Sequence, residues 1–194
     1  MMQPDKGAAA MKGRAVSIGI TLVLAVLAAG AAISGQDKYT LKVPNGLAFS
    51  EFRGYEGWQT ISVSHNGDKL AVILGNPAMI EAYKAGFPEK GKPFPDGAKM
   101  AKVHWIPEKS ESEPGQPLVP SVQHDVDFMV KDGKRFADSG GWGYAEFEYD
   151  SRSGTFRPGT LADEPPQAND ARCGFACHTV VKAQDYVFTK YQNR

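Results

Sequence analysis

The sequence has no charge imbalance and little cysteine. Its 194 residues contain 22 Lys and Arg and 22 Asp and Glu, so the formal net charge is zero. Nucleic-acid binders carry clustered basic residues, and this balance does not indicate one. Two cysteines exclude a disulfide-dense scaffold, and the chain shows neither an internal repeat nor heptads. With 42% hydrophobic and 23% charged residues, the chain is expected to fold as one domain, or two small ones at most.

The first 35 residues predict an export signal. Lys6, Lys12 and Arg14 make a positively charged start, and an apolar run over residues 15–33 follows. Small residues then offer cleavage sites before a polar stretch. The alternative is an uncleaved anchor, because about 18 apolar residues are just long enough to cross a bilayer. In either case we expect residues 36–194 to form a single periplasmic domain with its own core.

The hydrophobic pattern after this segment favours strands. Residues 58–64 alternate weakly and end in an Asn-Gly turn, and residues 69–74 are a short apolar run typical of a buried strand. An Asn-Pro pair then begins a short helix over residues 78–85, which a glycine closes.

Three more segments alternate in the manner of strands: residues 98–106, 122–130 and 144–149. In the first of them, Met100, Lys102 and His104 share one face. Residues 107–120 are polar and rich in proline, and they predict a surface loop. The expected fold class is therefore α+β, a predominantly antiparallel β-sheet with short helices.

The chemistry concentrates in the segment Cys173-Gly174-Phe175-Ala176-Cys177-His178. Two cysteines followed directly by a histidine are typical of c-type haem attachment, in which the thiols add to the haem vinyl groups and the histidine ligates iron. Three residues separate the cysteines instead of two, which weakens the signal. A disulfide in an exported protein, a zinc site and a redox dithiol remain alternatives for this motif alone.

The position of the motif bears on the second axial ligand. Only 16 residues follow His178, and none of them is methionine. Met79, Met100 and Met129 lie upstream, where a strand methionine is more often part of the core than a ligand. We therefore expect five-coordinate iron with an open distal site, which suits the binding or oxidation of a small molecule better than electron transfer alone.

Five motifs occur in a fixed order along the chain and cover roughly residues 49–191. They are Pro93-Phe94-Pro95-Asp96-Gly97, Lys102-Val103-His104-Trp105, Met129-Val130-Lys131-Asp132, Gly140-Gly141-Trp142-Gly143, and Cys173 to His178 followed by Asp185-Tyr186-Val187-Phe188. In this order they resemble the cytochrome P-460 family, which includes the β-sheet cytochromes c-prime.

The resemblance implies a mostly antiparallel homodimer with one covalently attached haem c per chain. Cytochromes P-460 oxidise hydroxylamine and carry a lysine joined to the porphyrin edge. The β-type cytochromes c-prime lack that bond, have an apolar distal pocket and bind nitric oxide. The chain is thus expected to bind and oxidise a small nitrogen species such as hydroxylamine, with an electron-transfer partner; the alternative is a non-catalytic nitric-oxide-binding protein.

The same resemblance assigns the haem-binding residues. They are Cys173, Cys177, His178 and Lys102, with His178 as the iron ligand. Lys102 occupies the lysine position of the strand after Pro-Asp-Gly and is the candidate for the covalent bond to the porphyrin. In a regular strand, Lys99 points to the opposite face.

Hydroxylamine loses protons as it loses electrons, so its oxidation needs a proton acceptor near the open iron position. Asp125 and Asp127, on one face of a strand, are the candidate catalytic residues, and Glu146 is a third carboxylate. His104 and His124 are alternatives. Three aromatic residues are candidates for the pocket wall or for an ordinary core: Phe128, Phe136 and Trp142.

Overall fold

The computed structural model describes residues 35–44, 46–88, 91–159 and 171–192, and only the backbone of residues 171–173. The chain divides after Gly35 into two units, of which Gln36–Arg194 contains nearly all the described residues. The expected export segment lies outside the described residues. Among the helices that are described, none has the length and apolar character needed to cross a membrane.

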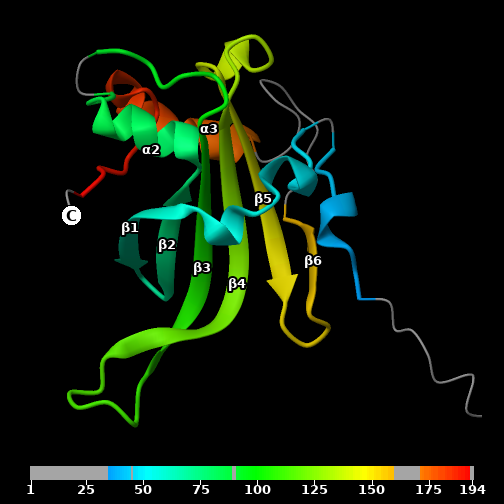
Figure 1. The fold of residues 1–194 in the computed structure, drawn as a ribbon. Helices are drawn as coiled ribbons and strands as arrows, with labels where there is room; N and C mark the ends of the chain where they lie inside the picture. Colours follow the sequence, from blue (N-terminus) through cyan, green and yellow to red (C-terminus); the bar gives the residue numbers. More distant parts are fainter. Residues whose placement is uncertain (1–34, 45, 89–90, 160–170, 193–194) are drawn as a thin grey trace, which may run out of the picture. The chain divides into compact units, whose positions relative to one another are not determined.

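Six strands form one antiparallel sheet in which each strand pairs with its neighbours in sequence (Figure 1). The strands are β1 (Gln59–Asn66), β2 (Lys69–Gly75), β3 (Lys99–Lys109), β4 (Leu118–Lys131), β5 (Trp142–Asp150) and β6 (Thr155–Pro158). This arrangement confirms the expected fold class, although the sequence pattern did not predict β6.

Two short α-helices lie at the same end of the sheet in Figure 1: α2 (Pro77–Lys84) and α3 (Ala171–His178). The predicted start of α2 is confirmed, because the Asn76 side chain accepts a hydrogen bond from the Met79 amide and a proline occupies the first turn. The other helices in the described part of the chain are short 3-10 helices: η1 (Lys38–Thr40), η2 (Phe49–Phe52), η3 (Tyr55–Gly57), η4 (Ala137–Ser139) and η5 (Thr179–Gln184).

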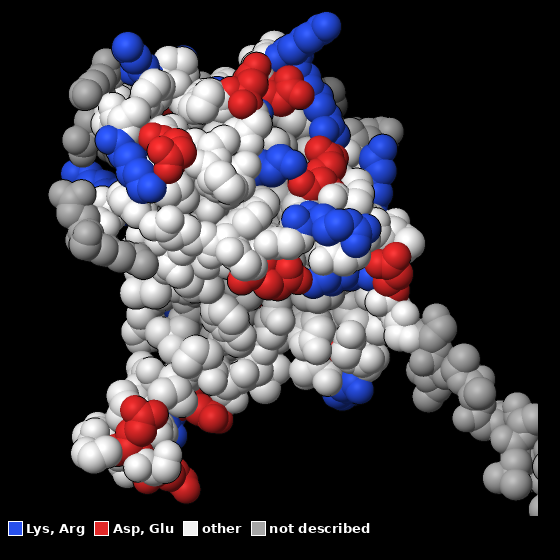
Figure 2. Space-filling model, viewed as in Figure 1, with Lys and Arg blue, Asp and Glu red and all other residues white. Residues whose placement is uncertain are grey.

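The hairpin between β3 and β4 is longer than the proline pattern predicts. The expected surface loop over residues 107–120 is wrong at both ends, because Pro107 pairs with Pro120 and Lys109 with Leu118. Prolines are tolerated in strands beside irregularities, and the register shifts next to this stretch. The hairpin forms an arm with acidic side chains at its tip (Figure 2), where Glu111 and Glu113 are exposed.

A β-bulge interrupts the predicted alternation of β4. His104 pairs with Asp125 and Trp105 with Gln123, so His124 is an extra residue with no partner position on β3. The alternation predicted for residues 122–130 is therefore wrong at His124. After the bulge the alternation is regular: Asp125 and Asp127 lie on one face, and the buried Val126 and Phe128 lie on the other.

The two faces of the sheet bury separate clusters. On one face, the aromatic core contains Ala101, Val103 and Phe128 together with five residues that precede β1: Val43, Leu47, Phe49, Phe52 and Tyr55. On the other, the helix-side core joins Met100, Met129 and Tyr144 to residues of α2 and of the C-terminal segment. As predicted, Lys99 lies on the face opposite Met100 and Lys102, since its Nζ is 2.5 Å from the Glu51 carbonyl oxygen.

Phe49 is the centre of the aromatic core and tests its contribution to stability. Its fully buried ring lies 4.8–6.0 Å from the rings of Phe128, Phe147, Phe156 and Tyr55. Phe49→Ala leaves a cavity there and is expected to lower the free energy of unfolding by about 3–5 kcal/mol, as measured by urea denaturation. The control Val63→Ala alters a 73% exposed side chain and should change that free energy by less than about 0.5 kcal/mol. Equal losses in the two variants would contradict this role of Phe49.

Candidate functional site

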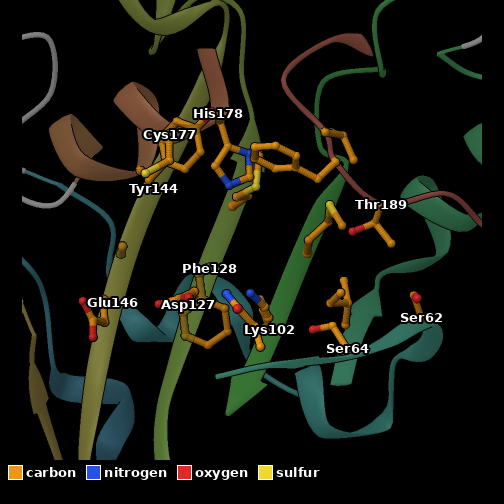
Figure 3. Close-up of a pocket in the computed structure, with 18 of the residues that line it drawn as sticks. Ser62, Ser64, Lys102, Asp127, Phe128, Tyr144, Glu146, Cys177, His178 and Thr189 are labelled. Atoms are coloured by element: carbon orange, nitrogen blue, oxygen red, sulfur yellow. The ribbon is translucent and has the colours of Figure 1, made fainter. Parts of the chain in front are cut away.

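A cavity of about 800 Å³ lies on the helix-side face of the sheet (Figure 3). Strands β1 to β5, helix α3 and residues 187–192 contribute to its wall. Its volume falls in the range of about 300–1,000 Å³ that is usual for small-molecule and cofactor sites. In Figure 3, His178 and Cys177 come from α3 at one side, and Lys102, Asp127 and Glu146 project from three strands at the other.

His178 ends α3 and presents a neutral imidazole to this cavity. Its Nδ1 lies 2.6 Å from the carbonyl oxygen of Tyr186. Because a carbonyl oxygen only accepts, Nδ1 carries the proton and Nε2 keeps its lone pair. Burial lowers the pKa of His178 and the charge of Lys102 adds to this, although the bond to Tyr186 opposes it. A neutral histidine fixed in this way through Nδ1 has the form that binds a metal through Nε2.

Ring packing and one glycine position α3 against β5. The imidazole of His178 lies between the rings of Tyr144, at 5.2 Å, and Phe188, at 4.9 Å. A Cβ at Gly174 would lie 2.8 Å from the Tyr144 ring, so the glycine allows the close approach of helix and strand. Gly174 therefore has a packing function within the cysteine motif.

The two cysteines of the motif differ in what the structure describes. Cys177 is a free, exposed cysteine that borders the cavity next to His178. The side chain of Cys173 lies outside the described residues. Covalent haem attachment through both sulfurs therefore stays a prediction, and the cavity beside Cys177 has space for a large planar group.

A buried ion pair anchors the segment that holds His178. Lys131 Nζ lies 2.7 Å from Asp185 Oδ1, and their side chains are only 7% and 11% exposed. The second carboxylate oxygen of Asp185 accepts a hydrogen bond of 2.7 Å from the Phe94 amide. The pair thus ties the C-terminal segment to β4 and to the loop before β3.

This anchor holds an unusual backbone conformation. Asp185 and Tyr186 have φ of +49° and +64°, a left-handed region that costs free energy for residues other than glycine. The Tyr186 ring packs onto Gly140, where any Cβ would overlap it. The ion pair and the glycine together place the Tyr186 carbonyl where it accepts a hydrogen bond from Nδ1–H of His178.

Opposite His178, a row of three ionisable side chains crosses the sheet. Lys102 pairs with Asp127 and Asp127 with Glu146, so the three lie side by side on β3, β4 and β5. Burial raises the pKa of Asp127 to about 7, and the charges of Asp125 and Glu146 contribute to the rise. Burial also raises the pKa of Glu146. Asp127 can therefore both take up and release a proton near neutral pH.

Asp125, the other predicted acceptor, lies on the same face of β4 two residues before Asp127. It is 1% exposed and is not among the residues that line the cavity. Burial favours its neutral form, but hydrogen bonds from His104, His124 and Lys69 outweigh it and hold the pKa of Asp125 well below its usual range. Its role as acceptor stays a prediction, and position in the cavity favours Asp127.

The structure also places the remaining candidates. Phe128 borders the cavity, but its ring stacks on Phe52 with centroids 4.0 Å apart. Phe136 packs in the aromatic core and Trp142 in the helix-side core. Of the two expected roles, pocket wall or ordinary core, the structure thus gives both residues a place in a core. Two of the three methionines, Met100 and Met129, border the cavity.

Sequence reasoning missed several lining residues. Ser62, Ser64 and Tyr144 come from strands, and Thr189 comes from the C-terminal segment, where its carbonyl accepts a 2.7 Å bond from Tyr83. Tyr144 could have been found, because it is two residues from Glu146 on β5 and so shares its face of the sheet. Nothing in the sequence marked the serines on β1 or Thr189.

The ion pair of Lys131 and Asp185 can be tested by removing one partner. Asp185→Ala leaves the ammonium group buried without its carboxylate, so we expect the free energy of unfolding to fall by about 3–5 kcal/mol in denaturant titrations. Lys182→Ala, in the exposed turn nearby, is the control and should change it by less than about 0.5 kcal/mol. A similar small effect of both would show that the anchor adds little.

The raised pKa of Asp127 predicts a dependence of stability on pH. The folded state binds this proton more tightly than the unfolded state, whose pKa is 3.8. The contribution is therefore present below that value and is lost as the pH rises toward the folded pKa of about 7. Because the side chain is 44% exposed, solvent screening limits the effect to the order of 1 kcal/mol.

In wild type, part of the free energy of unfolding should be lost between about pH 5 and about pH 8, and Asp127→Asn should remove this loss. Urea unfolding at the two pH values measures it. Asp68→Asn, in the exposed β1–β2 turn, should leave it unchanged. An equal loss in wild type and in Asp127→Asn would rule out Asp127 as its source.

A family model described as Cytochrome P460 matches residues 52–189, well over half of the chain, and the match spans the whole sheet, α3 and the cavity-lining segment through Thr189. A search of the curated proteins gave no match. The expected resemblance is therefore confirmed: the chain belongs to the cytochrome P460 family, and membership of a cytochrome family implies that it binds haem.

Proposed function

We propose that this chain is an exported mono-haem c-type cytochrome that binds and oxidises a small nitrogen compound such as hydroxylamine. The observation that carries the proposal is the composition of one cavity. It holds a neutral histidine with a free Nε2 on one side and the row of Lys102, Asp127 and Glu146 on the other. A metal ligand and a group that titrates near neutral pH are the two requirements of proton-coupled oxidation.

The residues that would hold haem come from the C-terminal motif. Cys173 and Cys177 would form the thioether bonds, and His178 would ligate iron through Nε2. Three features of the cavity fit a haem group: the His178 tautomer fixed by Tyr186, the thiol of Cys177 beside that imidazole, and the cavity volume. Haem would supply a redox-active iron with an open coordination position, from which electrons pass to an exported partner protein.

The charged row would handle the protons of the substrate. Asp127 borders the cavity and, with a pKa raised to about 7, accepts a proton from hydroxylamine as the molecule loses electrons. In the chain without haem, the positive charge of Lys102 beside Asp127 lowers the pKa of that carboxyl. Lys102 is also the residue we propose to be joined to the porphyrin edge.

The alternative, a nitric-oxide-binding β-type cytochrome c-prime, is expected to have an apolar distal pocket. Three ionisable side chains face His178 across this cavity instead. Burying such groups is unfavourable, so their presence in a cavity indicates a chemical role better than it indicates passive binding of a neutral gas. Turnover is therefore the function that the cavity favours.

The test uses protein produced in a host that matures c-type cytochromes. We expect Asp127→Asn to keep its covalent haem and its affinity for nitric oxide, but to oxidise hydroxylamine about 10²-fold more slowly, because a positioned base contributes at least that much. Asp68→Asn should match wild type in all three measurements. Lys102→Ala should lose the red-shifted ferrous Soret band that gives the family its name, whereas Lys99→Ala, on the opposite face of β3, should keep it.

Two results would overturn the proposal. Colourless protein would exclude the haem site altogether. Haem-loaded wild type that binds nitric oxide, has an ordinary five-coordinate spectrum and does not oxidise hydroxylamine would establish the binding protein instead of the enzyme.

A further inference from the structure

A chain of four side chains runs from the cavity to the surface of the protein. Asp127 borders the cavity, and its Oδ2 lies 3.7 Å from Nδ1 of His104. That Nδ1 is hydrogen-bonded to Oδ1 of the buried Asp125, whose Oδ2 lies 2.5 Å from Nδ1 of His124. The side chain of His124 is 41% exposed, while those of Asp125 and His104 are 2% and 11% exposed.

We propose that His104, Asp125 and His124 form a proton relay that connects Asp127 in the cavity with the solvent. The inference rests on the proposed function, since oxidation of hydroxylamine releases protons inside the cavity. It extends that function by assigning a route along which these protons leave.

The bulge in β4 makes the relay possible. In a regular strand His124 and Asp125 would point to opposite faces, because successive side chains alternate. His124 is the extra residue of the bulge, and this allows its imidazole to reach the carboxylate of the next residue. Bulges beside functional sites commonly redirect a side chain in this way.

The proton balance follows from the hydrogen-bonding atoms. With His104 carrying protons on both ring nitrogens, its Nδ1–H first passes to Asp125 Oδ1, which leaves a neutral imidazole with a free Nδ1 lone pair. Rotation of the Asp127 side chain then closes the 3.7 Å gap, and the carboxyl of Asp127 gives its proton to that nitrogen. Asp125 then protonates Nδ1 of the Nε2–H tautomer of His124, which releases the Nε2 proton to water. Exchange of ring protons with solvent restores that tautomer at the exposed His124, so Asp127 has lost one proton and water has gained one.

The charges around the relay suit this task. Lys69 on β2 lies 3.1 Å from Asp125 Oδ2 and, with the two imidazoles, keeps this carboxylate ionised. Lys102 on β3 lowers the pKa of Asp127, while Asp125 and Glu146 raise it. Glu148 on β5, which pairs with Asp125, adds a further acid. The cavity end of the chain thus titrates near neutral pH and its centre stays charged.

The mouth of the cavity is a competing route, because Asp127 is 44% exposed. Asp127 lines the cavity, so a cofactor bound there would cover part of its exposed surface. His104 is not among the lining residues and lies 3.7 Å from Asp127, so the relay would still lead from there to the surface.

A metal site is the other use that these ligand atoms suggest. One ligand atom from each of His104, Asp125 and Asp127 lies within 4.8 Å of the others. However, the Lys69 ammonium group already occupies the cluster, and the Nδ1 atoms of both histidines are engaged with Asp125. A cation would have to displace these partners, so the geometry favours proton transfer.

The experiment follows the protonation of Asp127 directly in the haem-loaded protein. The carboxylic acid C=O stretch of Asp127, identified by its loss in Asp127→Asn, is recorded by infrared spectroscopy after a rapid pH jump. We expect His124→Ala to slow the relaxation of this band at least ten-fold, to leave the midpoint of its titration in place, and to recover when imidazole is added to the buffer. His65→Ala, which removes an exposed imidazole from β1, should relax as wild type does.

Three outcomes would overturn the relay. Unchanged relaxation in both His124→Ala and His104→Gln would show that protons reach Asp127 through the cavity mouth. Binding of one Zn²⁺ per chain in calorimetry, lost in His104→Gln, would show a metal site instead. Colourless protein would remove the proposed function and the relay together, whereas coloured protein with unchanged relaxation removes the relay alone.

Discussion

The ion pair between Lys131 and Asp185 is the contact on which the geometry of the cavity depends. It is buried and also hydrogen-bonded to the backbone of Phe94 and Gly140, which satisfies charges that would otherwise destabilise the fold. Through it the C-terminal segment keeps a left-handed backbone at Tyr186 and directs that carbonyl at His178. The tautomer of the imidazole therefore depends on an ion pair whose two residues do not line the cavity.

The sheet supports chemistry on one face because the other face supplies stability. The aromatic core consists of apolar and aromatic side chains, and it fixes β3, β4 and β5 through rings such as Phe49 and Phe128. On the opposite face the same strands carry Lys102, Asp127 and Glu146 at positions that register places side by side. Burial raises the pKa of Asp127 to about 7, and the charges that the strand register places beside it contribute to this shift.

Much of the fold and of the site was predictable from local patterns. The alternation of β3 separated Lys102 from Lys99, the Asn-Pro pair located α2, and the resemblance in five motifs identified the family that the comparison confirmed. The predictions failed where a non-local pairing overrides the local signal. Prolines suggested a loop where the long hairpin pairs through Pro107 and Pro120, and a simple period of two could not reveal the bulge at His124.

The sequence by itself determined the strand faces, the family and the cysteine-histidine motif, because these depend on neighbours along the chain. Only the tertiary structure decided which of the two aspartates borders the cavity, which nitrogen of His178 is free, and that His104, Asp125 and His124 are joined. The bond from His178 to the Tyr186 carbonyl spans only eight residues, but it is held by the pair of Lys131 and Asp185, which are 54 residues apart. The bond between His104 and Asp125 likewise joins residues 21 positions apart on two strands. No local pattern encodes such contacts, since they exist only once the strands and the C-terminal segment have packed together.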